Sequence, residues 1–98
     1  MEIIKNTNGT ELTIAASGRL DTTTSPELEA EIKSSIEGIT SLTLDMAGVE
    51  YISSAGLRVI LSAQKAMNKQ GAMKIINVNS DVMEVFEITG FVDVLTIE

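Results

Sequence analysis

The sequence predicts an α/β fold: a mostly parallel sheet of four or five strands, with about three main helices and an N-terminal β-hairpin. Its 98 residues give room for one domain. Apolar and polar residues alternate over residues 41–46, as in a strand, whereas apolar residues over 26–36 and 55–70 recur one helical turn apart. The segments follow the order β-β-α-β-α-β-α-β, which favours a central sheet with helices packed on it.

The N-terminal hairpin is expected from two short apolar-rich runs at residues 1–4 and 12–16. Between these runs, Asn8 precedes Gly9, and an Asn-Gly pair readily adopts the positive φ angles of a tight hairpin turn. We therefore expect the first two strands to pair in an antiparallel manner.

The first helix is expected to begin near Pro26, a residue that suits the first turn of a helix. Thr24 or Ser25 can cap it with a side-chain hydroxyl. Gly38 is placed to end it. A stripe of residues one turn apart predicts the buried face of this helix: Leu28, Ile32 and Ile36.

The second half of the chain contains further alternating elements. We expect strands at residues 41–46, 73–78 and 91–97. We expect a loop at 47–54, a long helix at 55–70 and a short helix at 80–88. This loop is longer than the roughly two to six residues that usually join a strand to a helix. In the long helix, Gly56, Ile60, Ala63 and Met67 form the inward row, and Arg58, Ser62, Lys65 and Lys69 form the opposite, solvated face.

Composition limits the classes of function. The chain has no cysteine and no histidine, which excludes disulfides, thiolate chemistry, zinc fingers and imidazole bases. Its formal charge of -7 opposes binding to nucleic acid or to an anionic membrane. No apolar run approaches the roughly 18 residues that a membrane span needs. A protein partner or a small ligand remains, and we expect a cytoplasmic protein with no cofactor. We also expect no metal, because Asp21, Asp45 and Glu50 are scattered carboxylates of an acidic chain.

The candidate site lies where the expected loop enters the long helix. Ser53 and Ser54 stand at this junction, and sites in open α/β sheets collect at the C-terminal ends of strands. The simplest interpretation of a Ser-Ser pair here is a helix cap. Asp21, which follows the second strand, should reach the same edge of the sheet. Gly56 would let the first helical turn pack closely against neighbouring backbone.

Three segments of the chain resemble one known family. Residues 45–61, which contain Tyr51-Ile52-Ser53-Ser54-Ala55-Gly56-Leu57, resemble the signature of the STAS domain, in particular that of bacterial anti-sigma factor antagonists. Gly18-Arg19-Leu20-Asp21 resembles a second element of that family, and residues 80–91 resemble its closing helix and turn. The resemblance implies a single STAS domain over residues 1–98.

The resemblance also implies a function based on partner exchange. In that family, an anti-sigma factor that is also a serine kinase phosphorylates the serine at the position of Ser54. The unmodified protein binds the kinase, the phosphorylated form releases it, and a serine phosphatase resets the cycle. Asp21 and Arg58 would then border the contact surface, while Ser53 and Gly56 shape the turn. Ser53, which stands where an aspartate often precedes the acceptor, is an alternative acceptor.

Two other classes of function compete with this hypothesis. An enzyme with a nucleophilic serine needs a base, and the chain has no histidine, while Lys65 and Lys69 lie several turns from Ser54. We therefore expect no enzymatic activity, with ATP bound by the kinase alone. The second competitor is a constitutive STAS scaffold, or a subunit of a transport complex, that is never phosphorylated.

Overall fold

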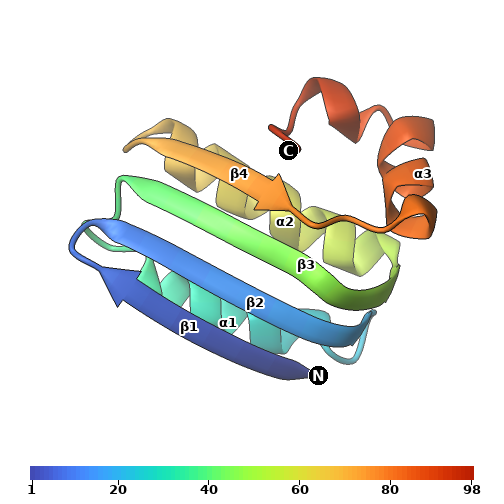
Figure 1. Cartoon of the computed structure of the whole chain (residues 1–98), viewed down its shortest axis with the longest axis horizontal. Coiled ribbons are helices and arrows are strands. Elements are labelled where there is room, and N and C mark those ends of the chain that lie inside the picture. The colour runs from blue at the N-terminus through green and yellow to red at the C-terminus, as the bar shows by residue number, and fades with distance from the viewer.

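The computed structural model describes residues 1–98 and contains one four-stranded sheet, three α-helices and a short 3₁₀ turn (Figure 1). The elements in chain order are β1 (Glu2–Asn8), β2 (Glu11–Leu20), α1 (Ser25–Ser35), β3 (Ser41–Ile52), α2 (Ser54–Asn68), β4 (Ala72–Ile76), α3 (Ser80–Ile88) and η1 (Phe91–Asp93). The sheet order is β1-β2-β3-β4. It is a mixed sheet, because β1 and β2 are antiparallel while the other two pairings are parallel. The predicted α/β class and N-terminal hairpin are confirmed.

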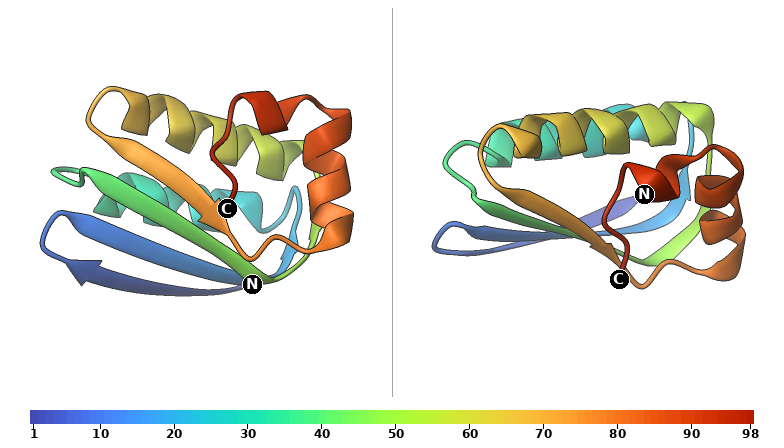
Figure 2. Two further views of the ribbon diagram at one scale, coloured as in Figure 1. Left: turned by 45° about the horizontal axis from the view of Figure 1, so that its top comes forward. Right: turned by 90° about the horizontal axis from the view of Figure 1, so that it is seen from above.

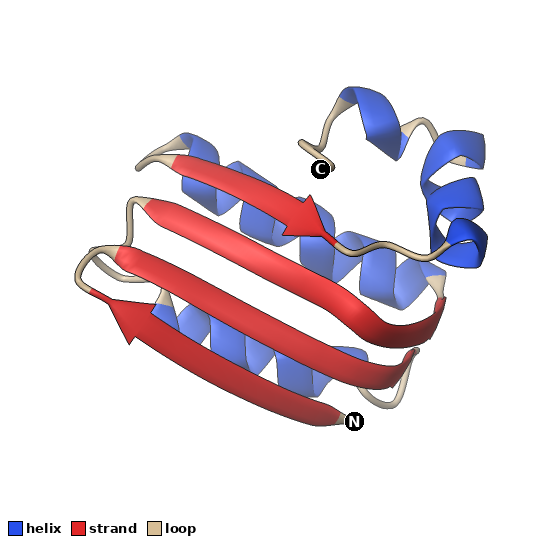
Figure 3. Ribbon diagram, in the orientation of Figure 1, coloured by secondary structure: helices blue, strands red, loops and turns tan.

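The helices divide into a layer and a cap. Figure 2 shows α1 and α2 side by side on one face of the sheet, with α3 at the end of the sheet where β3 finishes. Figure 3 shows that no helix covers the other face. The core lies between the sheet and the helix layer, and all four residues of the inward row predicted for the long helix are buried: Gly56, Ile60, Ala63 and Met67.

Strand β3 differs from the prediction, and the predicted loop over residues 47–54 is wrong. The strand runs on to Ile52, and Ser54 already belongs to α2. Two shifts in the pairing of β2 with β3, between Ala15 and Ser17 and between Gly18 and Arg19, place extra residues in β3. Bulges of this kind interrupt the alternation of buried and exposed side chains. The alternation that marks a strand therefore stops at Met46 although the strand does not.

The C-terminal segment also differs from the prediction. Residues 91–97 do not form a full strand. Gly90 has a φ of 79°, and the chain turns there into η1. Only the last residues reach the sheet, where Ile97 pairs with Ile75 in a single parallel bridge. Because residues 91–93 form the 3₁₀ turn, the segment that follows is too short for a fifth strand, and it pairs with β4 only at Ile97.

Asn79 fixes the start of α3 and joins it to β3. Its side-chain oxygen accepts a hydrogen bond from the backbone N–H of Val82 at 2.8 Å, as an N-cap residue does. Its side-chain amide donates to the carbonyl of Val49 at 2.8 Å. One side chain thus caps a helix and anchors it to the bulged part of the neighbouring strand. This pairing holds α3 close to the end of β3.

Candidate functional site

Ser53 uses its polar groups to hold the junction between β3 and α2. It is the N-cap of α2, and its hydroxyl accepts a long hydrogen bond from the backbone N–H of Gly56 at 3.4 Å. Its own N–H donates to the carbonyl of Leu20 at 2.9 Å, and its carbonyl accepts from the N–H of Leu57 at 3.0 Å. Ser53 is half-buried. Its role in the structure is therefore the cap that the local sequence predicts.

Ser54 has a different environment. It is the first residue of α2 and is exposed, and its hydroxyl makes no hydrogen bond to any other group of the chain. Because the side chain of Ser53 already caps the helix, the hydroxyl of Ser54 is not needed to stabilise the start of α2. The two adjacent serines thus divide the tasks of capping and of presenting an accessible oxygen.

Gly56 allows α2 to press against the end of β2. A Cβ atom at this position would lie 2.8 Å from Cγ of Leu20, 2.9 Å from the carbonyl oxygen of Leu20 and 2.9 Å from Cγ1 of Ile52. Distances this short are not tolerated without movement of the neighbours. Gly56 is buried, so it sets the position of the turn from beneath the surface.

Asp21 lies at the same edge of the sheet and organises the turn before α1. Its Oδ1 accepts hydrogen bonds from the backbone N–H groups of Thr23 at 3.0 Å and Thr24 at 3.1 Å. These bonds, that of Thr24 first, hold the pKa of the Asp21 carboxyl below its ordinary value, while partial burial opposes them. Arg19 lies 3.6 Å from Oδ2 and acts in the same direction. Asp21 is therefore a fixed negative charge beside the serine turn.

Arg19 and Tyr51 form a pair at this edge that sequence reasoning missed as site residues. They lie opposite each other in the pairing of β2 with β3. The guanidinium carbon of Arg19 lies 4.3 Å from the centroid of the Tyr51 ring, within the range of a cation–π contact. Because the bulges of β3 decide which residues face each other, only the register of the two strands could have revealed this pair.

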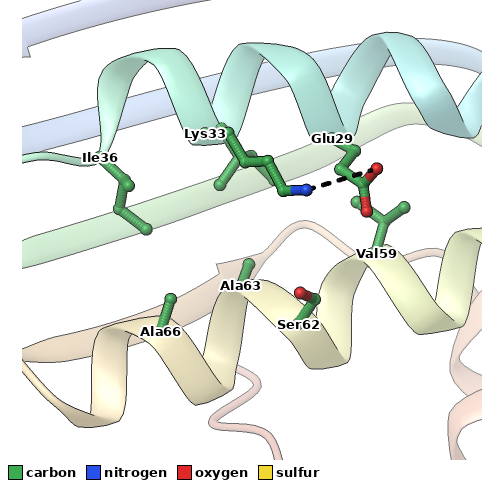
Figure 4. Close-up of a pocket in the computed structure, with 8 residues that line it drawn as sticks. Glu29, Lys33, Ile36, Val59, Ser62, Ala63 and Ala66 are labelled. Carbon is green, nitrogen blue, oxygen red and sulfur yellow. Dashed lines mark ion pairs between the residues drawn. The ribbon is translucent and has the colours of Figure 1, made fainter.

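Arg58 lies one helical turn after Ser54. It is exposed and lines a shallow hollow together with Thr22, Pro26 and Glu29, at the start of the seam between α1 and α2. The hollow continues along the seam as an apolar groove, since Glu29 and Val59 line both. Figure 4 shows this groove, with the ion pair between Glu29 and Lys33 at its rim, 3.8 Å long.

The structure therefore brings the predicted site residues to one end of the molecule. Asp21 and Ser53 follow directly after paired strands, since Leu20 is paired with Ile52, and Ser54 and Arg58 share the first turns of α2. The chain contains no group of three carboxylates placed to hold a metal ion. Its helices are all too short or too polar to cross a bilayer.

Comparison with known proteins identifies relatives over nearly the whole chain. A STAS domain family model matches residues 2–98. A Bordetella bronchiseptica protein named "Putative anti-sigma factor antagonist BtrV" is 35% identical over 82 residues, which cover 82% of this chain and 71% of that protein. The anti-sigma-B factor antagonist of Bacillus subtilis is 29% identical over 98 residues, covering 99% of this chain and 88% of the relative.

Solved structures share the fold at lower identity. The anti-sigma factor antagonist SpoIIAA in its unphosphorylated form matches with a TM-score of 0.85 and 17% identity, over 99% of this chain and 88% of that one. The phosphorylated form of SpoIIAA, described as a Bacillus cell fate determinant, matches with a TM-score of 0.77 and 16% identity, over 99% of this chain and 91% of that one. At these identities the likeness establishes the fold.

The division of tasks between the two serines predicts different losses of stability. Ser53→Ala should lower the free energy of unfolding by about 1 kcal/mol, because the N-cap acceptor is lost. Ser54→Ala should change it by less than about 0.5 kcal/mol, because this hydroxyl makes no bond. Chemical denaturation of the two variants beside the parent measures both values. Equal losses would contradict the assignment of the cap to Ser53.

The close approach at Gly56 predicts an unusual response to alanine. In an open helix interior, Gly→Ala is stabilising by roughly 1 kcal/mol. Gly56→Ala should instead lower the free energy of unfolding by about 1–3 kcal/mol, because the new methyl group collides with Leu20 and Ile52. Ser62→Ala, at an exposed position of the same helix, is the control and should change little. A stabilised Gly56→Ala variant would show that α2 does not press on β2.

The hydrogen bonds to Asp21 predict a stability that depends on pH. Because the folded pKa lies below the unfolded value of about 3.9, the contribution of the charged carboxylate is complete above that pH and is lost as the pH falls through the folded pKa. Asp21→Asn, which mimics the protonated group, should therefore be less stable than the parent at neutral pH. The gap should close in acid. Denaturation series from about pH 7 to about pH 2 measure it, and a gap that does not depend on pH would contradict the account.

Proposed function

Because the chain belongs to the STAS domain family and, within it, to the anti-sigma factor antagonists, we propose that it acts as a protein-binding switch gated by phosphorylation of Ser54. In its unmodified form it binds an anti-sigma factor that is also a serine kinase, and so frees a sigma factor. Phosphorylation ends this binding. A serine phosphatase restores the unmodified form. We place this cycle in the cytoplasm, where transcription is regulated.

The observation that carries the proposal is the free hydroxyl of Ser54. It is exposed and unbonded at a turn that Ser53 and Gly56 hold in place, so a kinase can reach it without unfolding the helix. Ser53 is less suited as an acceptor, because the residue is half-buried and its hydroxyl already accepts a hydrogen bond from the N–H of Gly56. The geometry thus supports Ser54 over the alternative acceptor.

Both chemical steps of the cycle act on Ser54 while a partner enzyme, the kinase or the phosphatase, is bound. Ser54 Oγ attacks the γ-phosphorus of ATP held by the kinase, a new O–P bond forms, ADP leaves, and the hydroxyl proton passes to a base of the kinase or to water. In the separate step that resets the cycle, water attacks the phosphorus in the active site of the phosphatase, which returns the serine hydroxyl and releases inorganic phosphate. The chain itself supplies the acceptor and the surface around it and binds no cofactor.

The effect on affinity follows from charge and solvation. A phosphate adds about 1.5 to 2 negative charges. At the start of a helix the group is tolerated by the folded chain, because the helix dipole favours an anion there. Within an interface it must lose water, and it adds to the negative charge that Asp21 places at the same edge of the sheet. We therefore expect a large change in affinity and little change in fold.

The proposal predicts one phosphate on Ser54 in the cell. Intact mass and site mapping of the protein purified from its native host should show a single phosphate in some growth condition, and Ser54→Ala should abolish it. Ser53→Ala, the matched control, should still be modified. A phosphate retained in Ser54→Ala would move the acceptor to Ser53. Its absence in every condition would favour a constitutive scaffold and overturn the proposed switch.

A further inference from the structure

The basic residues of the chain fall into two groups. Of the seven, four lie outside α2, and each of these has a carboxylate within 4.0 Å: Lys5, Arg19, Lys33 and Lys74. The other three lie on or at the end of α2 and form no ion pair: Arg58, Lys65 and Lys69. Helix α2 contains no acidic residue. These three cations are unpaired although the chain carries a net charge of -7.

Arg58 is the unpaired cation closest along α2 to the proposed phosphoacceptor. Residues four apart on a helix have Cβ atoms about 5–6 Å from each other. Side chains on a helix lean toward its N-terminus, so the long side chain of Arg58 can extend to a group on Ser54. Lys65 shares the solvent face but lies 11 residues beyond Ser54, about 16 Å along the helix. Arg58 alone of the three can reach a group on Ser54.

We propose that Arg58 binds the phosphate of phosphorylated Ser54 within the same chain. The inference rests on the proposed function in taking Ser54 as the acceptor. A guanidinium offers several N–H donors in a planar arrangement that matches phosphate oxygens. The hollow lined by Thr22, Pro26 and Glu29 leaves the Arg58 side chain room to turn. Phosphorylation therefore adds a charge and also fixes a cation that has no ion-pair partner in the unmodified form.

The nearby charged groups leave Arg58 available. On α1, Glu29 lines the same hollow, but its carboxylate pairs with Lys33 at 3.8 Å. At the sheet edge, Asp21 is satisfied by backbone N–H groups and by Arg19. A phosphate dianion carries more charge than either carboxylate and is the strongest acceptor within reach of Arg58. Arg58 is therefore free to bind a phosphate on Ser54, because no carboxylate of the chain forms an ion pair with it.

The second pKa of the phosphate tests this inference without any kinase. Protein carrying phosphoserine at position 54, incorporated during translation, is titrated by ³¹P NMR. A phosphoserine titrates near pH 6, and an adjacent cation lowers this pKa by favouring the dianion. Arg58→Gln should raise the pKa by about 0.2–0.4 unit, as the loss of one ion pair between residues four apart on a helix implies. Lys65→Gln changes the net charge equally and should leave the pKa unchanged, because it lies beyond the screening length of roughly 8 Å.

The outcomes separate a specific contact from a general field. A shift in Arg58→Gln alone supports the intramolecular contact. Equal shifts in the two variants would overturn it, because the general charge of the chain would then explain the data. No shift in either variant would also overturn it, because Arg58 would then have no effect on the phosphate. The titration does not depend on whether the cell phosphorylates Ser54. A positive result with no phosphate in the native host would thus sink the proposed function and leave the contact standing.

Discussion

The contact between the start of α2 and the end of β2 is the constraint on which the site depends. Gly56 lies against Leu20 with no space for a Cβ atom, and the N–H of Ser53 donates to the carbonyl of Leu20. These contacts join two segments some thirty residues apart in the chain. They place Asp21 beside the serine turn and leave Ser54 as the first exposed residue of the helix. Without them, the residues would share a sheet edge but not a common surface.

The bulges in β3 are the second device that shapes this surface. Two extra residues in β3 relative to β2 keep the strand paired to its end while changing which side chains face the core. They bring Tyr51 opposite Arg19, whose guanidinium contacts the aromatic ring and also pairs with Asp21. Asn79 ties α3 to the same stretch of β3. The irregular part of the sheet thus carries Tyr51 and the carbonyl of Val49 that anchors Asn79.

Sequence patterns predict the regular parts of this fold and fail where geometry becomes irregular. The helical period of Gly56, Ile60, Ala63 and Met67 identifies the buried face of α2. The extension of β3 was missed because bulges disturb the alternation of side chains. Two adjacent serines look alike in sequence, and only hydrogen bonds distinguish the cap from the free hydroxyl. A strand is expected after Gly90 because these residues are apolar, but the structure forms a 3₁₀ turn there, and apolar composition does not distinguish the two.

The central claim is that one phosphate on Ser54 controls binding while the fold stays the same. The most direct test is titration calorimetry of the unmodified protein, and of protein carrying phosphoserine at position 54, against the anti-sigma factor of the same host. The account predicts that the phosphate weakens binding more than a hundredfold, a change of about 3 kcal/mol. It also predicts matching circular dichroism spectra for the two forms. Equal affinities would contradict the claim, and so would an affinity loss accompanied by loss of helix.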